Sequence, residues 1–123
     1  MIWPFRRKTK KRMARIVIDE PITSSTRVSV LKALKQIEDR EFPALILRID
    51  SPGGTVGDSQ EIYSAIKRLK EKGCKVVASF GNISASGGVY IGVAAHKIVA
   101  NPGTITGSIG VIIRGNNLSE LLN

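Results

Sequence analysis

The chain has 123 residues, 42% of them hydrophobic and 24% charged, which is enough for one small globular domain. Its formal net charge is +9, but residues 1–15 hold seven basic residues and no acidic one, so the remainder is close to neutral. No segment of the sequence approaches the roughly 18 consecutive apolar residues of a transmembrane helix, and no apolar segment typical of a secretory signal follows the basic run. The single cysteine, Cys74, excludes an internal disulfide and is expected to be a small buried residue.

Residues 1–13 are expected to form a basic, aromatic arm that precedes a domain over residues 14–123. Trp3 and Phe5 stand beside the basic run. Such a segment fits peripheral attachment to an anionic membrane, where aromatic rings lie at the interface and each positive charge contributes about 1 kcal/mol. A solvated tail and a nucleic-acid-binding segment are the alternatives, because a basic run alone is unspecific. Membrane contact is favoured, and no nucleic-acid partner is expected.

Strands and helices are expected to alternate along the domain. Strands are predicted over 14–18, 44–49, 75–80, 97–100 and 109–113, and helices over 26–40, 57–72, 86–95 and from 118 onward. Ser25 or Thr26 is the expected N-cap of the first helix, and Gly73 the stop of the second. The nearly continuous apolar run over 44–49 is typical of a strand buried on both faces. This alternation predicts right-handed βαβ units and a largely parallel sheet, and the amphipathic segment at the end suggests a truncated domain.

Three glycine-bearing turns follow predicted strands, at residues 51–54, 86–88 and 103–108. In open α/β sheets, sites form beyond the carboxyl ends of the strands, so these turns are expected to meet at one crevice. An acyl-transfer site needs a hydroxyl at a helix start with little bulk beside it, and Ser86 followed by Gly87 fits that need. Backbone amides around Gly53 could face a developing oxyanion, and the helix dipole near Ser86 would add positive potential. The alternative is that Ser86 is an ordinary N-cap and the glycines are packing points.

Other kinds of site fit the sequence less well. Position 84 is Ser84 where the nucleophile elbow of α/β-hydrolases needs glycine, and the turn at 51–54 lacks the Gly-Lys-Ser/Thr ending of a phosphate loop. One cysteine and one histidine without a close acidic pair argue against a metal site. His96 is expected at the surface rather than as a general base, and no lysine of the chain stands out for that role.

Four segments resemble, in order and spacing, the signal peptide peptidase A (protease IV) family of bacterial serine peptidases. They are residues 50–54, 84–91, 94–98 and 106–111, and the resemblance runs from about residue 14 to the end. It implies a Clp-protease/crotonase-like α/β fold of stacked ββα units with a largely parallel sheet, C-terminally incomplete in this chain. It also implies a Ser–Lys dyad with Ser86 as nucleophile, and an oxyanion hole formed by the amides of Gly53 and Gly87.

The same resemblance implies substrates and partners. It implies an enzyme that degrades cleaved signal peptides or other membrane-associated peptides. It also implies assembly into a homo-oligomeric ring, and no cofactor. The residues that would line the substrate groove are Ser51, Pro52, Gly54, Thr55 and Val56. Family members often carry a transmembrane helix; here we expect peripheral attachment at the cytoplasmic face of a bacterial membrane.

Two positions depart from the family pattern. The family's lysine base lies about fifty residues beyond the serine, which is past residue 123. Position 96 is typically acidic, and here it is His96. The first expectation is therefore a serine endopeptidase fragment lacking its base. One alternative is a non-catalytic chain, either a peptide-binding or assembly subunit or a decayed remnant. The other is an acyl-CoA enzyme of the crotonase type, which is disfavoured because the other motifs match the peptidase.

Overall fold

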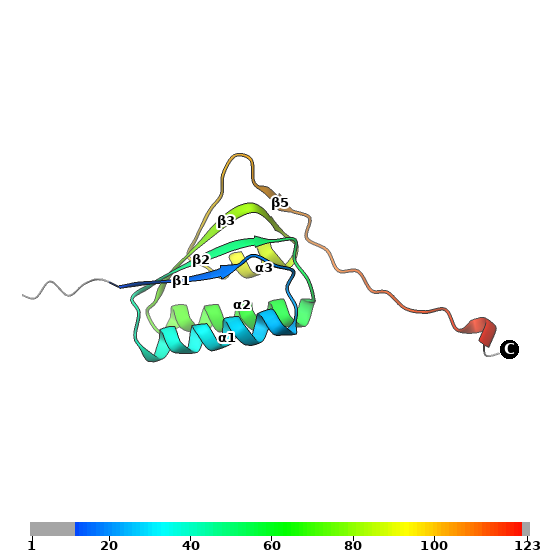
Figure 1. Cartoon of the computed structure of the whole chain (residues 1–123), viewed down its shortest axis with the longest axis horizontal. Helices are drawn as coiled ribbons and strands as arrows, with labels where there is room; N and C mark the ends of the chain where they lie inside the picture. The colour runs from blue at the N-terminus through cyan, green and yellow to red at the C-terminus, as the bar shows by residue number, and fades with distance from the viewer. Residues whose placement is uncertain (1–11, 122–123) are drawn as a thin grey trace, which may run out of the picture.

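The computed structural model describes residues 12–121. A parallel sheet lies over a layer of helices, and the last residues extend away from this body (Figure 1). The strands are β1 (Met13–Ile18), β2 (Ala44–Ser51), β3 (Lys75–Ala85), β4 (Lys97–Val99) and β5 (Ile105–Gly107). The helices are α1 (Ser24–Asp39), α2 (Val56–Glu71), α3 (Gly87–Gly92) and the short 3-10 helix η1 (Ser119–Leu121). The arm expected over residues 1–13 lies almost wholly outside the described residues.

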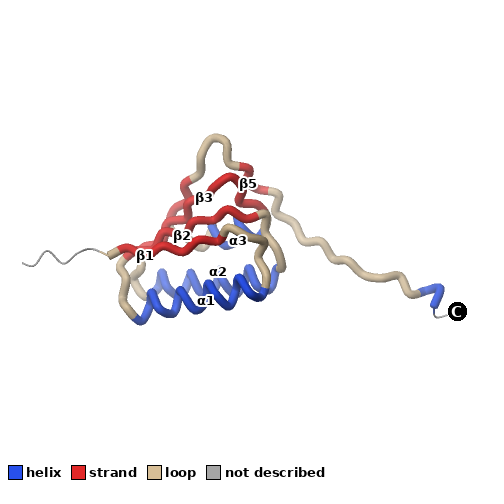
Figure 2. The backbone as a smooth tube through the Cα atoms, in the orientation of Figure 1, coloured by secondary structure: helices blue, strands red, loops and turns tan. Residues whose placement is uncertain are grey.

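The sheet has the order β1-β2-β3-β4, and β5 pairs with the far end of β3. All of these pairings are parallel. β3 is long enough to pair with β4 through Val77–Ser79 and then with β5 through Ile83–Ala85. Figure 2 shows β5 beside the far end of β3, past the loop that rises above the sheet. The α/β class with a parallel sheet is thus confirmed.

The core lies between the sheet and the helices. In β2, Leu45, Leu47 and Ile49 are at most 1% exposed, whereas the residues between them are only half-buried. The prediction that this strand is buried on both faces is wrong for the described part of the chain. α1, α2 and α3 all pack toward the same face, and no helix among residues 12–121 covers the other.

The helix ends follow local side-chain chemistry. α1 begins after Thr23, whose hydroxyl accepts a hydrogen bond from the Thr26 amide while the Thr26 hydroxyl accepts one from the Thr23 amide. The prediction of Ser25 or Thr26 as N-cap was wrong because it missed this reciprocal box. Gly73 has φ +98°, which confirms it as the residue that stops α2.

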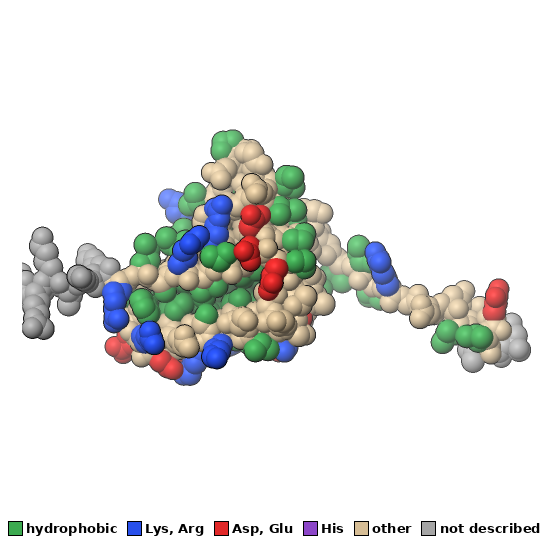
Figure 3. Space-filling view, viewed as in Figure 1, with side chains coloured by type: hydrophobic (Ala, Val, Ile, Leu, Met, Phe, Trp, Pro, Cys, Tyr) green, Lys and Arg blue, Asp and Glu red, His purple; other side chains and the backbone are tan. Residues whose placement is uncertain are grey.

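The segments after residue 80 differ most from expectation. Residues 81–85, which were expected in neither the strand over 75–80 nor the helix over 86–95, continue β3. Ser84 pairs with Ser51 of β2, and Ile83–Ala85 pair with β5, which lies within the turn predicted at 103–108. Residues 109–113, predicted as a strand, are extended but unpaired among the described residues, and Ile109, Val111 and Ile113 are 67–91% exposed. Apolar side chains accordingly stand out along this segment in Figure 3.

Candidate active site

The three predicted glycine turns lie together at the carboxyl ends of the strands. β2 ends at Ser51 and β3 at Ala85, and these two ends are neighbours because Ser51 is paired with Ser84. The Ser86 amide donates a hydrogen bond of 2.9 Å to the Gly107 carbonyl oxygen at the end of β5. The crevice expected from the strand order therefore exists, with Ser86 at its centre.

Ser86 stands at the N-cap position of α3, but it does not act as a capping side chain. Its backbone has φ 51° and ψ −115°, and its hydroxyl makes no capping hydrogen bond. A non-glycine residue at positive φ stores strain, and such residues cluster at functional sites. The half-buried hydroxyl is thus left available beside the start of a helix.

Gly53 and Gly87 lie directly against Ser86. A Cβ atom built on Gly53, where φ is +98°, would lie 2.9 Å from the Ser86 Cβ and 2.8 Å from the Gly87 nitrogen. A Cβ on Gly87 would lie 2.6 Å from the Ser59 Oγ. Gly53 requires glycine because backbone atoms lie this close, whereas a side chain on Gly87 would have to displace the Ser59 hydroxyl. The two glycines predicted for the oxyanion hole are brought together beside the predicted nucleophile.

Gly54 presents a free backbone edge to the same crevice. Ile22 donates its amide to the Gly53 carbonyl oxygen and accepts the Thr55 amide, each at 3.0 Å, in an isolated parallel bridge. Because strand residues alternate in the direction of their polar groups, the Gly54 N–H and C=O face away from Ile22. A side chain on Gly54 would overlap the Ile22 carbonyl, so the bridge itself requires glycine there.

A cavity of about 220 Å³ opens beside Ser86. Its lining residues are Gly54, Val56, Ser59, Ser86, Gly87, Tyr90, Ile109, Gly110 and Val111. The Tyr90 ring stacks on Tyr63 with centroids 4.7 Å apart, which stiffens that wall. The cavity is mainly apolar, and the Ser86 hydroxyl and backbone amides lie at its edge.

Of the residues predicted to line a substrate groove, only some face this cavity. Gly54 and Val56 line it, whereas Pro52 and Thr55 are exposed outside it and Ser51 is fully buried beneath. The Ser51 hydroxyl instead accepts the Gly53 amide at 3.1 Å. Sequence reasoning missed Ser59, Tyr90 and the wall formed by residues 109–111, because only the packing of the helices and the path of the chain after β5 bring them to the cavity.

The only histidine and the described lysines lie away from the cavity. His96 is exposed, as expected, and its Nδ1 accepts a hydrogen bond of 3.0 Å from the Val76 amide. A carboxylate could accept the same bond, which explains how histidine can stand where the family resemblance implies an acid. No lysine within residues 12–121 lines the cavity beside Ser86.

A charged cluster holds the start of α2, and with it the Val56 wall. Asp58, which is 8% exposed, accepts hydrogen bonds from Ser24 at 3.5 Å and from the Thr55 hydroxyl. Arg27 of α1 lies 3.3 Å from Asp58 and 3.1 Å from the exposed Glu61. The same Thr55 hydroxyl lies 3.2 Å from the Ile22 carbonyl oxygen, so the cluster is joined to the bridge at Gly54.

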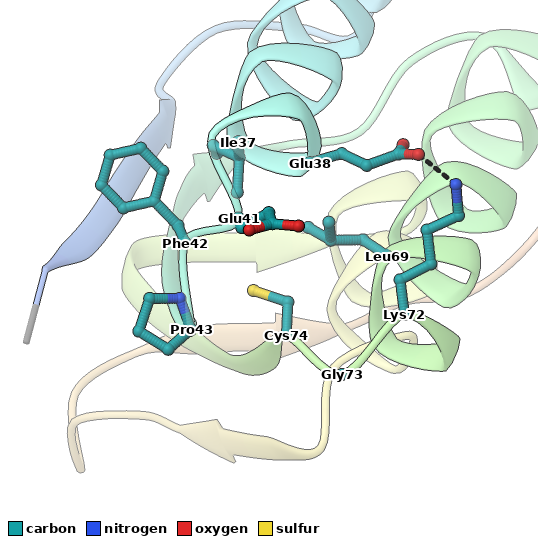
Figure 4. A pocket seen from close by; sticks show the side chains of 9 residues that line it. All are labelled: Ile37, Glu38, Glu41, Phe42, Pro43, Leu69, Lys72, Gly73 and Cys74. Carbon is teal, nitrogen blue, oxygen red and sulfur yellow. Dashed lines mark hydrogen bonds and ion pairs between the residues drawn. The ribbon is translucent and has the colours of Figure 1, made fainter.

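A second cavity, of about 400 Å³, lies at the opposite end of the sheet, where β2 and β3 begin. Figure 4 shows the Cys74 sulfur pointing into it and the Glu38–Lys72 ion pair across it. Burial raises the pKa of the Cys74 thiol above its ordinary value of 9.0, so the thiol stays protonated at neutral pH. Cys74 is 4% exposed, which confirms the expectation of a small buried residue.

Comparison with known proteins identifies relatives of the sequence. Residues 68–123 match the profile described as Peptidase family S49. The Synechocystis sp. protein "Putative protease slr0021" is 66% identical over 122 residues, covering 99% of this chain and 44% of that protein. Protease 4 of Salmonella typhi is 44% identical over 73 residues, covering 59% of this chain and 12% of that protein.

Solved structures share the fold. The 1510-N membrane protease specific for a stomatin homolog from Pyrococcus horikoshii has a TM-score of 0.67 at 27% identity, covering 78% of this chain and 48% of that one. ClpP1 from Listeria monocytogenes has a TM-score of 0.62 at 27% identity, covering 66% and 46% respectively. The Clp-like fold expected from the resemblance is confirmed. The chain spans less than half the length of each of these proteins.

Proposed function

Because the chain belongs to peptidase family S49, we propose that it carries the nucleophile and oxyanion side of a serine endopeptidase active site. The observation that carries this proposal is the setting of Ser86. Its hydroxyl is not used for capping, its backbone is held at φ 51°, and Gly53 and Gly87 touch it. An ordinary N-cap serine would need none of these features.

In this proposal the oxyanion is bound by backbone amides. Gly87 is the first residue of α3, and the first amides of a helix have no acceptor within it. The Gly87 amide therefore points out of the helix beside the Ser86 side chain, and Gly53 approaches from the other turn. Removing one such donor typically lowers kcat by about 100- to 1,000-fold.

The substrate would be an extended peptide with apolar side chains. The free edge of Gly54 can pair with a peptide backbone as an added strand, which is a common way of binding peptides. Val56, Tyr90 and Val111 would then contact a side chain next to the scissile bond. Such chemistry suits cleaved signal peptides and other membrane-associated peptides, which are rich in apolar residues.

The general base would be a lysine from outside these 123 residues. This is supported by the absence of a lysine from the cavity lining in the described part of the chain, and by the greater length of the 66% identical relative. A lysine can take the proton of Ser86 when burial lowers its pKa. A homo-oligomeric ring, as the Clp-like fold suggests, would enclose this site.

We also propose peripheral contact with the cytoplasmic face of a bacterial membrane. Trp3, Phe5 and the basic arm would make this contact, and they lie outside the described residues. The P. horikoshii structure is that of a membrane protease, which supports the proposal. Within residues 12–121, no helix is both long and apolar enough to cross a bilayer.

Peptide hydrolysis by an extended chain tests the activity. The extended chain is the full-length Synechocystis relative in which residues 1–123 of this chain replace the matching region. It should cleave apolar peptides, and Ser86→Ala should abolish cleavage because no nucleophile remains. Ser79→Ala, which removes a hydroxyl from the same strand but away from the cavity, is the matched control. Full activity in the Ser86→Ala variant would overturn the assignment.

A non-catalytic peptide-binding role is the second candidate, because the described residues supply no base beside Ser86. In that case the extended chain would bind apolar peptides without cleaving them. Ser86→Ala would then leave the affinity and the absence of cleavage unchanged.

A further inference from the structure

Two buried serines are paired across the sheet beneath the proposed active site. Ser51 at the end of β2 is paired with Ser84 of β3, and both are 0% exposed. The Ser51 Oγ accepts the Gly53 amide at 3.1 Å. The Ser84 Oγ has no hydrogen-bond partner among the residues that the structure describes. A buried hydroxyl without a partner destabilises the state in which it occurs, so Ser84 calls for an explanation.

These hydroxyls lie where they can act on the oxyanion hole. A Cβ atom on Gly88, in the first turn of α3, would lie 3.0 Å from the Ser84 Oγ and 3.1 Å from the Ser51 carbonyl oxygen. Both serines are thus directly below the turn that carries Ser86. The Gly53 amide, which the proposed function assigns to the oxyanion, is occupied by Ser51 in this state.

We propose that Ser51 and Ser84 are positioning residues that control whether the Gly53 amide is available, an inference that rests on the proposed function. In the described state Ser51 holds the amide and Ser84 is unpaired. Rotation of the Ser51 side chain toward Ser84 would join the two hydroxyls, since the two residues are partners in the sheet and both side chains lie on its buried face. The Gly53 amide would then be released toward an oxyanion at Ser86. One hydrogen bond replaces another, so the two states can lie close in free energy.

This arrangement predicts opposite effects for the two serines. Ser51→Ala removes the acceptor that occupies the amide, so a fluorophosphonate should modify Ser86 about fivefold faster. Ser84→Ala removes the partner of the released state, so modification should be about fivefold slower. The double variant should match Ser51→Ala, because Ser84 acts only through Ser51. A purely structural role would slow both single variants.

The rates are measured in the extended chain, with Ser79→Ala as the control that leaves the rate unchanged. If the parent is modified but Ser84→Ala reacts at the parent rate, or Ser51→Ala reacts more slowly, the inference is overturned and the proposed function stands. If the parent is not modified at all, the proposed function is overturned and the inference falls with it.

Hydrogen exchange of the Gly53 amide gives a readout that needs no chemistry. It is followed by NMR in the 123-residue chain itself. The amide should exchange slowly in the parent and in Ser84→Ala, and at least about tenfold faster in Ser51→Ala, because only Ser51 occupies it in the resting state. Equal exchange in the parent and Ser51→Ala would overturn the inference. If Ser51→Ala does not fold, the parent alone decides. Exchange of its Gly53 amide as fast as that of an open loop amide would overturn the inference.

Discussion

Ser86 has a backbone conformation that glycine adopts more readily than serine. With φ 51° and ψ −115°, any Cβ at this position is strained, by about 1–3 kcal/mol. Ser86→Gly should therefore raise the free energy of unfolding by about 1 kcal/mol relative to Ser86→Ala, although both variants lose the hydroxyl. Urea denaturation of the two variants measures the difference. Equal stabilities would mean that the turn is not strained and that this argument for function fails.

Gly54 and Gly57 provide a contrast between a glycine that is required and one that is not. A Cβ on Gly54 would overlap the Ile22 carbonyl, whereas nothing lies within 4 Å of a Cβ on Gly57. Gly54→Ala should cost about 2–3 kcal/mol, since the bridge to Ile22 must open. Gly57→Ala, in the first turn of α2, should stabilise by about 0.5 kcal/mol through its helix propensity. Thermal unfolding measures whether each variant is less or more stable than the parent. A Gly54→Ala variant as stable as the parent would contradict the bridge to Ile22.

At the scale of elements, the link between α1 and α2 depends on one carboxylate more than on the other. Asp58 is nearly buried and bonds Arg27, Thr55 and Ser24, while Glu61 meets only Arg27 and its side chain is 55% exposed. Asp58→Asn should lower the free energy of unfolding by about 1–3 kcal/mol, because it weakens buried hydrogen bonds to a charge. Glu61→Gln should change it by less than about 1 kcal/mol. If chemical denaturation gives the same loss of unfolding free energy for Asp58→Asn and Glu61→Gln, the two carboxylates do not have these unequal roles.

The elements with a local signal were predictable from the sequence. β1, α2 and β4 appear close to where periodicity and β-branched residues placed them, and Gly73 ends α2 as expected. The full length of β3 was not predictable, because Ile83–Ala85 become strand by pairing with β5 and, at Ser84, with Ser51 of β2. The turn predicted at 103–108 contains β5 for the same reason.

The candidate site was predictable as a set of turns but not as a cavity. Ser86, Gly53 and Gly87 could be named from glycine-bearing turns after strands and from the family resemblance. Tyr90 and residues 109–111 could not, because they reach the cavity only through the packing of α3 and the path of the chain after β5. The burial of Ser51 follows from the alternation of buried and half-buried residues along β2, which continues past the apolar run over 44–49.

At the scale of the whole molecule, we propose that the chain supplies a nucleophile, a glycine-lined oxyanion site and a peptide-binding edge on one parallel sheet. The extended chain would add the base. Reaction of the extended chain with a fluorophosphonate, read by intact mass and peptide mapping, tests this account most directly. The account predicts a single adduct on Ser86 that is absent from the Ser86→Ala variant. No adduct, or an adduct on Ser84 or Ser108 in place of Ser86, would contradict it.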